Sequence, residues 1–280
     1  MIFFRAIAGI PKSCLPLIVF LISSMMLVFS RRSAGVIRHN VQKVYGLPAI
    51  SSFSAAFVRQ VMTCQVFLAL ETIRYIFRPS DVVIEGLDKA KEMLQRASED
   101  SGVVIIAAHH GAWELAGHCS ARFLKGDFYA LAKPSRSRWF TKILNEFRNR
   151  LGMKVLWTDS KTLLKEMMGV ANQKNHLGFV MDQRPAKKGS GYTCNFLGVQ
   201  GTQIVQGPAM MAARKNMPVI GIHVVRLGLC RYHFFTTEVL PGGHGETDEQ
   251  KIAQLMADDL SKMILRYPEQ WAWNYRRWKW

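Results

Sequence analysis

From Asp81 onward, short apolar runs alternate with longer amphipathic stretches, and this alternation constrains the fold more than any other feature. The runs Gly102–Ala108 ("GVVIIAA") and Leu177–Asp182 ("LGFVMD") predict buried strands, whereas Trp113–Leu124 and Glu249–Arg266 have helical periodicity. Strands that alternate with helices predict an α/β fold, with a mixed central sheet and helices on both faces. Ligands of such sheets bind beyond the carboxyl ends of the strands.

The other expected elements follow the same alternation. We expect further strands at Asp81–Gly86, Asp127–Lys133, Lys154–Trp157, Pro218–Arg226 and Arg231–Val239, and further helices at Lys89–Ser98, Trp139–Leu151, Thr162–Asn172 and Pro208–Lys215.

An uncharged run, Ser13–Ser30, precedes this pattern. Its 18 residues are at the lower limit for a helix that crosses a bilayer. A signal peptide and a buried core helix are the alternatives, although Arg31 and Arg32 directly after the run are poor context for cleavage. Basic residues are denser after the run than before it, so the positive-inside rule places the rest of the chain in the cytoplasm. We therefore expect an uncleaved N-terminal membrane-anchor helix that spans the membrane.

These patterns divide the chain into three parts. We expect a membrane anchor over residues 1–32, a helical membrane-proximal segment over 33–80 and an α/β domain over 81–280. The middle segment has apolar positions at helical spacing over Ala34–Phe77. This spacing fits a helix along the membrane and a helix packed on the α/β domain equally well.

The charge balance predicts an anionic partner. Lys and Arg total 37 against 20 for Asp and Glu, a formal charge of +17, which suits nucleic acid, anionic lipid or a phosphorylated substrate. A mean hydropathy of +0.03 is high for so basic a chain and favours a membrane surface. The five cysteines show no CxxC spacing, which indicates a reducing compartment and neither a disulfide framework nor a zinc site.

Two histidines and a carboxylate mark one strand end, in "AAHHGAWELAG". His109 follows the strand, and Glu114 lies five residues later in the first turn of the expected helix. A neutral imidazole can act as general base when a carboxylate orients its other nitrogen. Two alternatives stay open: His110 pairs with Glu114, or the segment is a structural helix start with incidental histidines. Because no GxSxG elbow, P-loop or GxGxxG is present, a base that activates the substrate's own hydroxyl fits better than a protein nucleophile.

Four segments, taken together, resemble the bacterial lipid A biosynthesis acyltransferases, which are lauroyl and myristoyl transferases of the lysophospholipid acyltransferase-like superfamily. The segments are "HHGAWELAG", "MDQRPAKKG", "FLGVQGTQIVQGPAMMAARKNMPVI" and "YPEQWAWNYRRWKW", in this order within residues 81–280. The resemblance implies that His109 is the base and that Glu114 orients it. It also implies that Arg184, in "DQRP", binds a phosphate or the oxyanion; a structural ion pair with Asp182 is the alternative.

Further residues are candidates for binding the substrate. Basic side chains near strand ends suit phosphate oxygens, although a solvated basic loop would look the same. The resemblance adds the turn before the Pro208 helix, whose N–H groups would assist the oxyanion. The expected substrate-binding residues are Lys133, Arg136, Arg138, Asp182, Gln183, Arg184, Lys187 and Gly207.

The C-terminal segment mixes tryptophan and tyrosine with arginine and lysine. Such side chains suit the headgroup level of a membrane, and they equally suit a segment packed on the protein body.

We therefore expect an acyltransferase that moves a fatty acyl chain from acyl carrier protein to a hydroxyl of a phosphorylated glycolipid precursor of lipid A. It would work at the bacterial inner membrane, on anionic lipid, with the catalytic domain facing the cytoplasm and with no metal or cofactor. One alternative is the same transfer to a lysophospholipid or an aminolipid, and another is a non-catalytic basic lipid-binding protein. Nucleic acid is not expected as a partner, because no recognised binding motif is present.

Overall fold

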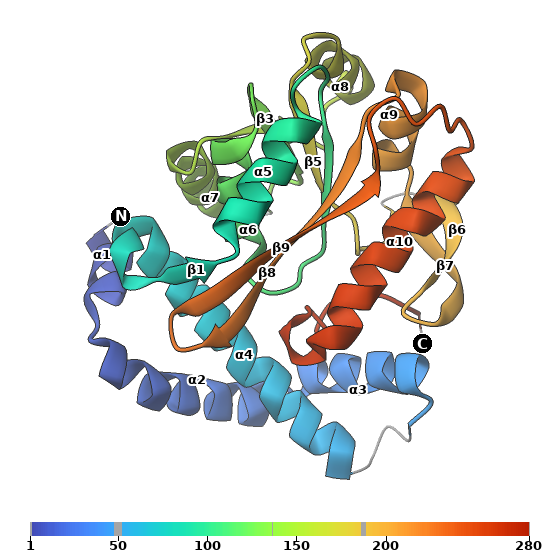
Figure 1. Cartoon of the computed structure of the whole chain (residues 1–280). Coiled ribbons are helices and arrows are strands. Elements are labelled where there is room, and N and C mark those ends of the chain that lie inside the picture. The colour runs from blue at the N-terminus through green and yellow to red at the C-terminus, as the bar shows by residue number, and fades with distance from the viewer. Residues whose placement is uncertain (1, 48–51, 136, 186–188, 280) are drawn as a thin grey trace.

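A seven-stranded mixed sheet forms the centre of the computed structural model, which describes residues 2–47, 52–135, 137–185 and 189–279. Its strand order is β1-β9-β8-β2-β5-β3-β4, with helices on both faces (Figure 1). The strands are β1 (Val83–Glu85), β2 (Val104–Ala107), β3 (Phe128–Ala132), β4 (Met153–Trp157), β5 (His176–Val180), β8 (Val219–Gly228) and β9 (Arg231–Leu240). The predicted fold class is confirmed.

The helices of the α/β part match the expected ones closely. They are α5 (Leu87–Ala97), α6 (Trp113–Phe123), α7 (Arg138–Arg150), α8 (Leu163–Asn172), α9 (Gly207–Lys215) and α10 (Glu249–Arg266). Every strand and helix expected from Asp81 onward is present, with ends that differ by no more than two residues. One element was not predicted: an antiparallel hairpin of β6 (Gly191–Phe196) and β7 (Val199–Val205), which packs on α10.

Strands β8, β2, β5, β3 and β4 run parallel to one another, whereas β9 is antiparallel to β8 and parallel to β1. The central strand β2 lies between β8 and β5, and Ala107 at its end is paired with Val180 of β5. The residues that follow these two strands therefore emerge side by side at one edge of the sheet.

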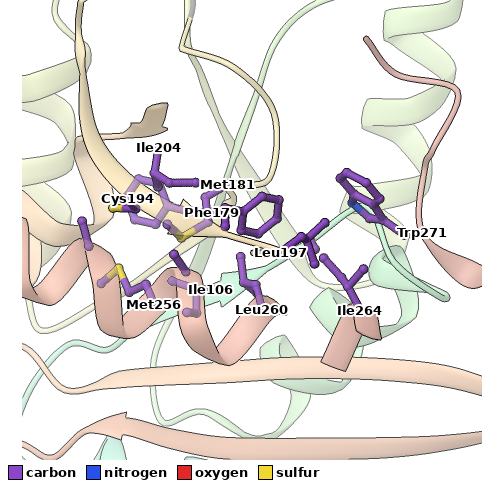
Figure 2. Packing of buried hydrophobic residues seen from close by; sticks show 14 of the residues in the cluster. Ile106, Phe179, Met181, Cys194, Leu197, Ile204, Met256, Leu260, Ile264 and Trp271 are labelled. Atoms are coloured by element: carbon purple, nitrogen blue, oxygen red, sulfur yellow. The ribbon is translucent and has the colours of Figure 1, made fainter. Parts of the chain in front are cut away.

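Alternate residues of β2 enter two different hydrophobic clusters, as the period of a strand requires. Val104 and Ile106 face a cluster that includes α9, α10 and the β6–β7 hairpin, and Figure 2 shows Trp271 at one end of it. Ile105 and Ala107 face the other cluster, with residues of α5 and α6. Burial on both sides explains why this strand is an unbroken apolar run.

Four helices precede the sheet: α1 (Ile2–Gly9), α2 (Leu15–Phe29), α3 (Arg31–Tyr45) and α4 (Ser52–Phe77). The expected helical stretch Ala34–Phe77 thus holds parts of two helices, and α3 ends where Gly46 adopts a left-handed conformation with φ of 65°. Figure 1 shows α2, α3 and α4 gathered along one edge of the layers. The core clusters contain residues of these helices, so they pack on the α/β part.

Helix α4 carries two buried charged residues. Glu71 accepts hydrogen bonds from Arg226 (3.0 and 3.1 Å) and from the hydroxyl of Tyr232 (2.5 Å), and Arg74 pairs with Asp81 at 2.5 Å. Two helical stretches, 12–29 and 53–77, are long and apolar enough to cross a membrane by length and composition alone. The buried charges of the second show that it is packed into the protein body.

Candidate active site

His109 and Asp182 meet where two neighbouring parallel strands end. His109 lies two residues beyond β2, and Asp182 lies two residues beyond β5. The Nδ1 atom of His109 is 2.8 Å from Oδ1 of Asp182, and the backbone N–H of His109 donates to the same oxygen at 3.0 Å. Because a carboxylate only accepts, Nδ1 carries the proton, and the lone pair of Nε2 remains as the acceptor.

The other carboxylate oxygen of Asp182 also has a donor. The indole Nε1 of Trp271 donates to Oδ2 at 2.7 Å, and both side chains are almost fully buried. Trp271 follows α10 and the short helix Pro268–Gln270, and the adjacent Ala272 donates its N–H to the carbonyl of His109 at 2.9 Å. The C-terminal segment therefore holds both the carboxylate and the backbone of the histidine.

These contacts set the protonation of the pair. Burial alone would lower the pKa of His109, but the charge and hydrogen bond of Asp182, followed by the charge of Glu114, outweigh it and raise this pKa above its usual 6.5. Burial alone would raise the pKa of Asp182, but the charge and hydrogen bonds of His109 and the Trp271 indole lower it. Asp182 is thus an anion that favours the imidazolium form of His109.

Glu114 does not orient His109 in the structure, in contrast to the role that its spacing suggested. Its carboxylate accepts two hydrogen bonds from Arg148 of α7, at 2.5 and 3.1 Å, in a bidentate pair. The physical reason is that Glu114 begins α6 and faces α7, whereas Asp182 follows the strand adjacent to His109. Glu114 acts on the imidazole through its charge.

His110 lies in a different environment from His109. Its side chain is 2% exposed, and its Nε2 donates to the backbone carbonyl of Tyr267 at 2.9 Å. Burial lowers the pKa of His110 to about 4, so it is neutral. This geometry favours His109 over His110 as the base, because a general base must reach its substrate.

An apolar cavity of about 590 Å³ opens at His109. Its walls come from α4, from the start of α6, from α7 and from Phe4 of α1, with Arg148 and Glu114 at the same site. Pockets of 300–1,000 Å³ hold small-molecule ligands. The cavity wall is otherwise built from side chains such as Leu68, Ile73 and Phe147. The cavity is thus mostly apolar, with the imidazole of His109 among its polar groups.

The comparison with known proteins adds the family. The family described as bacterial lipid A biosynthesis acyltransferase matches residues 1–280. The chain belongs to the bacterial lipid A biosynthesis acyltransferase family. It is 25% identical over 278 residues to the lipid A biosynthesis palmitoleoyltransferase of Escherichia coli (strain K12), covering 94% of this chain and 85% of that protein. The lipid A biosynthesis acyltransferase of Shigella flexneri matches with the same figures.

The expected substrate-binding residues of this lipid A acyltransferase fall into three groups. Gln183 is at the imidazole, with Nε2 3.5 Å from Nε2 of His109, and the backbone N–H of Arg184 donates to the hydroxyl of Tyr275 at 3.3 Å. Lys133 and Arg138 are exposed beyond β3 and at the start of α7, outside the cavity lining. Arg136 and Lys187 lie outside the described residues.

Two further points of the sequence analysis concern Arg184 and Gly207. The alternative ion pair of Arg184 with Asp182 is absent from the described contacts of Asp182, which go to His109 and Trp271. Gly207 begins α9, where an added Cβ would lie 3.1 Å from the ring of Phe179, and it is not among the described residues that line the cavity. The N-terminal turn nearest the base is instead that of α6.

Sequence reasoning missed two residues of the acyltransferase site, Trp271 and Arg148. Trp271 was noted only among aromatic residues that suit headgroups or a buried segment, and its burial supports the second reading for that residue. Arg148 lies in the last turn of α7 beside another basic residue, Arg150, so nothing in the local sequence distinguishes it. In the described part of the chain, no group of three or more His, Cys, Asp or Glu side chains is placed to hold a metal ion.

Proposed function

We propose that this lipid A acyltransferase moves a fatty acyl chain from acyl carrier protein to a hydroxyl of a phosphorylated glycolipid precursor of lipid A, with His109 as general base. Family membership establishes acyl transfer in lipid A biosynthesis. The observation that carries the mechanism is the His109–Asp182 pair at the mouth of an apolar cavity of about 590 Å³.

The two ring nitrogens of His109 have different roles in the proposed reaction. Asp182 holds the Nδ1 proton, so Nε2 accepts the proton of the acceptor hydroxyl while its oxygen attacks the thioester carbonyl. The new oxygen–carbon bond forms, the carbon–sulfur bond breaks, and the proton on Nε2 passes to the leaving thiolate. Asp182 stabilises the imidazolium between these steps, which is why its buried charge favours transfer.

The negative charge that develops on the thioester oxygen during attack needs hydrogen-bond donors to stabilise it. The first turn of α6, from Trp113, begins at the cavity wall beside the base, and helix N-terminal N–H groups suit an anion. Arg148 lines the same cavity and is held in place by Glu114. We assign the oxyanion to these groups.

The donor and acceptor fit the charge of the protein. Acyl carrier protein is acidic, and the chain has a formal charge of +17, which favours encounter. Phosphates of the acceptor suit the side chains of Lys133, Arg138 and Arg184, which follow the ends of strands β3 and β5. The enzyme works at the bacterial inner membrane, and the active site faces the cytoplasm, where acyl carrier protein is made.

Transfer by the purified full chain in detergent tests this function. Acylated carrier proteins of different chain lengths and a lipid A precursor are the substrates, and mass spectrometry follows the acceptor. We expect one added acyl group and release of the free carrier thiol. Use of acyl-coenzyme A alone would contradict the donor, and acylation of added lysophospholipid in place of the glycolipid would contradict the acceptor.

A further inference from the structure

The apolar helix α2 is joined to the protein body at both of its ends. On the N-terminal side, Arg74 of α4 donates to the backbone carbonyl of Ile10, and the rings of Phe4 and Phe147 are 5.3 Å apart. On the C-terminal side, Asn40 of α3 donates to the backbone carbonyl of Trp273 at 2.7 Å. The segments before and after α2 therefore belong to the same packed body.

Helix α2 also packs on the body along its length. Leu15, Val19 and Ser23 lie one turn apart on a buried side, and α2 lies against α4. Large apolar side chains over the rest of the helix surface are exposed, and we call them the α2 stripe: Leu17 (63% exposed), Phe20 (58%), Leu21 (53%), Met25 (60%), Val28 (63%) and Phe29 (79%). One side of the helix is thus protein-covered, and the other is apolar and exposed.

The regular α-helix α2 is shorter than the 18-residue stretch 12–29 that by length could cross a membrane. Its 15 residues rise about 22 Å at 1.5 Å per residue, whereas the hydrocarbon core of a bilayer is about 30 Å thick. The uncharged run extends to Ser13, but residues Lys12–Cys14 form a separate 3-10 turn after Pro11.

Exposed basic residues flank the α2 stripe at both ends. Arg5 and Lys12 lie before it, and Arg31 and Arg32 lie after it. Basic residues at both ends of an apolar stripe match anionic headgroups on one membrane surface. A spanning helix would place one of these two basic ends on the far side of the membrane.

We propose that α2 lies flat in one leaflet of the membrane, with the α2 stripe in contact with lipid chains and both flanking basic pairs at anionic headgroups of that same leaflet. This proposal rests on the proposed function at a membrane, and it replaces the expected spanning anchor. A spanning α2 would carry α1 across the bilayer and remove Phe4 from the wall of the acyl cavity.

The side of the membrane on which α1 lies is a direct test. Cys14, which is exposed, is first replaced by Ser. Single cysteines are then introduced at Ala6 of α1 and, as the control for the body, at Lys262 of α10; both positions are exposed. A membrane-impermeant maleimide is applied to spheroplasts and to inside-out vesicles of cells that produce the full chain.

We expect both cysteines to react in inside-out vesicles and neither to react in intact spheroplasts. Reaction of the Ala6→Cys cysteine in spheroplasts alone, with the Lys262→Cys cysteine reacting in inside-out vesicles alone, would show that α2 spans the membrane and overturn the proposal. The labelling does not depend on turnover, so its result is separate from the test of acyl transfer.

Vesicle binding tests the α2 stripe itself. The double change Leu21→Asp and Met25→Asp should weaken flotation of the full chain with phosphatidylglycerol-containing vesicles by at least about tenfold, because it removes buried apolar area and adds charge. Leu164→Asp on α8 is the matched control, since Leu164 is 50% exposed and α8 lies at the opposite edge of the molecule in Figure 1. Equal binding by all three proteins would overturn the proposal. So would a Leu21→Cys disulfide between two copies that forms in vesicles at full yield, because a second copy would then cover the stripe.

Discussion

Among the described residues, two histidine–aspartate pairs differ in what surrounds them. In the first, Nδ1 of His109 meets Asp182 at 2.8 Å, and the imidazole is 26% exposed at the cavity. In the second, Nε2 of His223 on β8 meets Asp259 of α10 at 3.1 Å, and the imidazole is fully buried. The same two functional groups thus occur in an open and a sealed form.

The His223–Asp259 pair is packed tightly against its surroundings. A Cβ added at Gly221 would lie only 2.0 Å from the carboxylate of Asp259, so glycine is required beside it. The remaining nitrogen of His223, Nδ1, is buried with no hydrogen-bond partner among the described residues. This pair joins a strand to a helix, and its free nitrogen has no route to a substrate.

Whether a histidine in such a pair can act as a base depends on which ring nitrogen the aspartate leaves available. Asp182 takes Nδ1 of His109 and leaves Nε2 at the cavity, whereas Asp259 takes Nε2 of His223. A carboxylate next to a histidine is therefore not enough to identify a catalytic base. The second ring nitrogen must also lie where a substrate can reach it.

The largest effect is expected for His109→Ala. Loss of the general base should lower kcat/KM by roughly 10²–10⁴-fold, and because the side chain borders a cavity that water can enter, Tm should fall less than for the sealed pair. His223→Gln should do the opposite: it disturbs a buried pair, which costs about 3–5 kcal/mol, but the folded enzyme should keep its kcat/KM within a few-fold. Acyl-transfer assays and thermal unfolding of both variants check these expectations. A large loss of activity in His223→Gln and a large loss of stability in His109→Ala would contradict the roles assigned to the two pairs.

Asp182→Asn should be the next most severe change, within the roughly 10²–10⁴-fold range by which general-base catalysis contributes to kcat. Asp182 accepts from His109 on one oxygen and from Trp271 on the other, and an amide can accept on only one side. Because Asp182 raises the pKa of His109, its loss should lower that pKa. A neutral base is active above its pKa, so the acid limb of the kcat/KM profile should move to lower pH.

A pH profile of the Asp182→Asn enzyme from pH 5 to 9 checks this sign. In the unmodified enzyme the acid limb should lie above pH 6.5, because the pKa of His109 is raised from that value. An acid limb that stays in place or moves to higher pH would contradict the assignment of Asp182.

The α/β part could be predicted from the sequence because its signals are local. Strands such as β2 and β5 are buried on both faces, and their apolar runs are visible in the chain. The rule that chemistry gathers beyond strand ends also placed His109 and Asp182 in one region. The β6–β7 hairpin was missed because its strands are half polar, include Gly191 and Gly201, and contain a bulge between Cys194 and Phe196.

The partners within the site could not be predicted, because they depend on contacts between distant segments. Glu114 is only five positions after His109, so local spacing favoured that pair. Asp182 and Trp271 become neighbours of His109 only through the β2–β5 pairing and the C-terminal segment. The packing of α2 on α4 is likewise invisible in the composition of the apolar run, so the sequence alone does not distinguish a spanning helix from one that lies flat in the membrane.

Trp271→Phe should have an intermediate effect. It removes the hydrogen bond to Oδ2 of Asp182, and a hydrogen bond to a charged group is worth about 1.5–3 kcal/mol, so kcat should fall roughly 10–100-fold. The pKa of Asp182 should rise, because the indole helps to lower it. Trp273→Phe is the matched control: Trp273 is equally buried, but its Nε1 donates to the carbonyl of Pro268. Equal losses of kcat in both variants would reduce Trp271 to a packing residue.

The smallest effect is expected for Glu114→Gln, which separates the sequence-based role of Glu114 from its structural one. Its contact is with Arg148, and the two side chains are 23% and 16% exposed. A partly exposed ion pair is worth on the order of 1 kcal/mol, so kcat/KM should fall by less than about tenfold. The acid limb should move slightly to lower pH, since the charge of Glu114 acts on His109 after that of Asp182.

Glu146→Gln is the matched control for Glu114→Gln, because Glu146 pairs with Arg150 on the exposed side of α7 and should leave both kcat/KM and the pH profile unchanged. The effects of Glu114→Gln and Asp182→Asn show which of the two carboxylates near His109 orients it. If Glu114→Gln were as severe as Asp182→Asn and moved the acid limb as far, Glu114 would orient His109 during turnover, and α6 would have to shift toward the imidazole when substrate binds. A mild loss with a small shift assigns orientation to Asp182 and leaves Glu114 to hold Arg148 at the cavity.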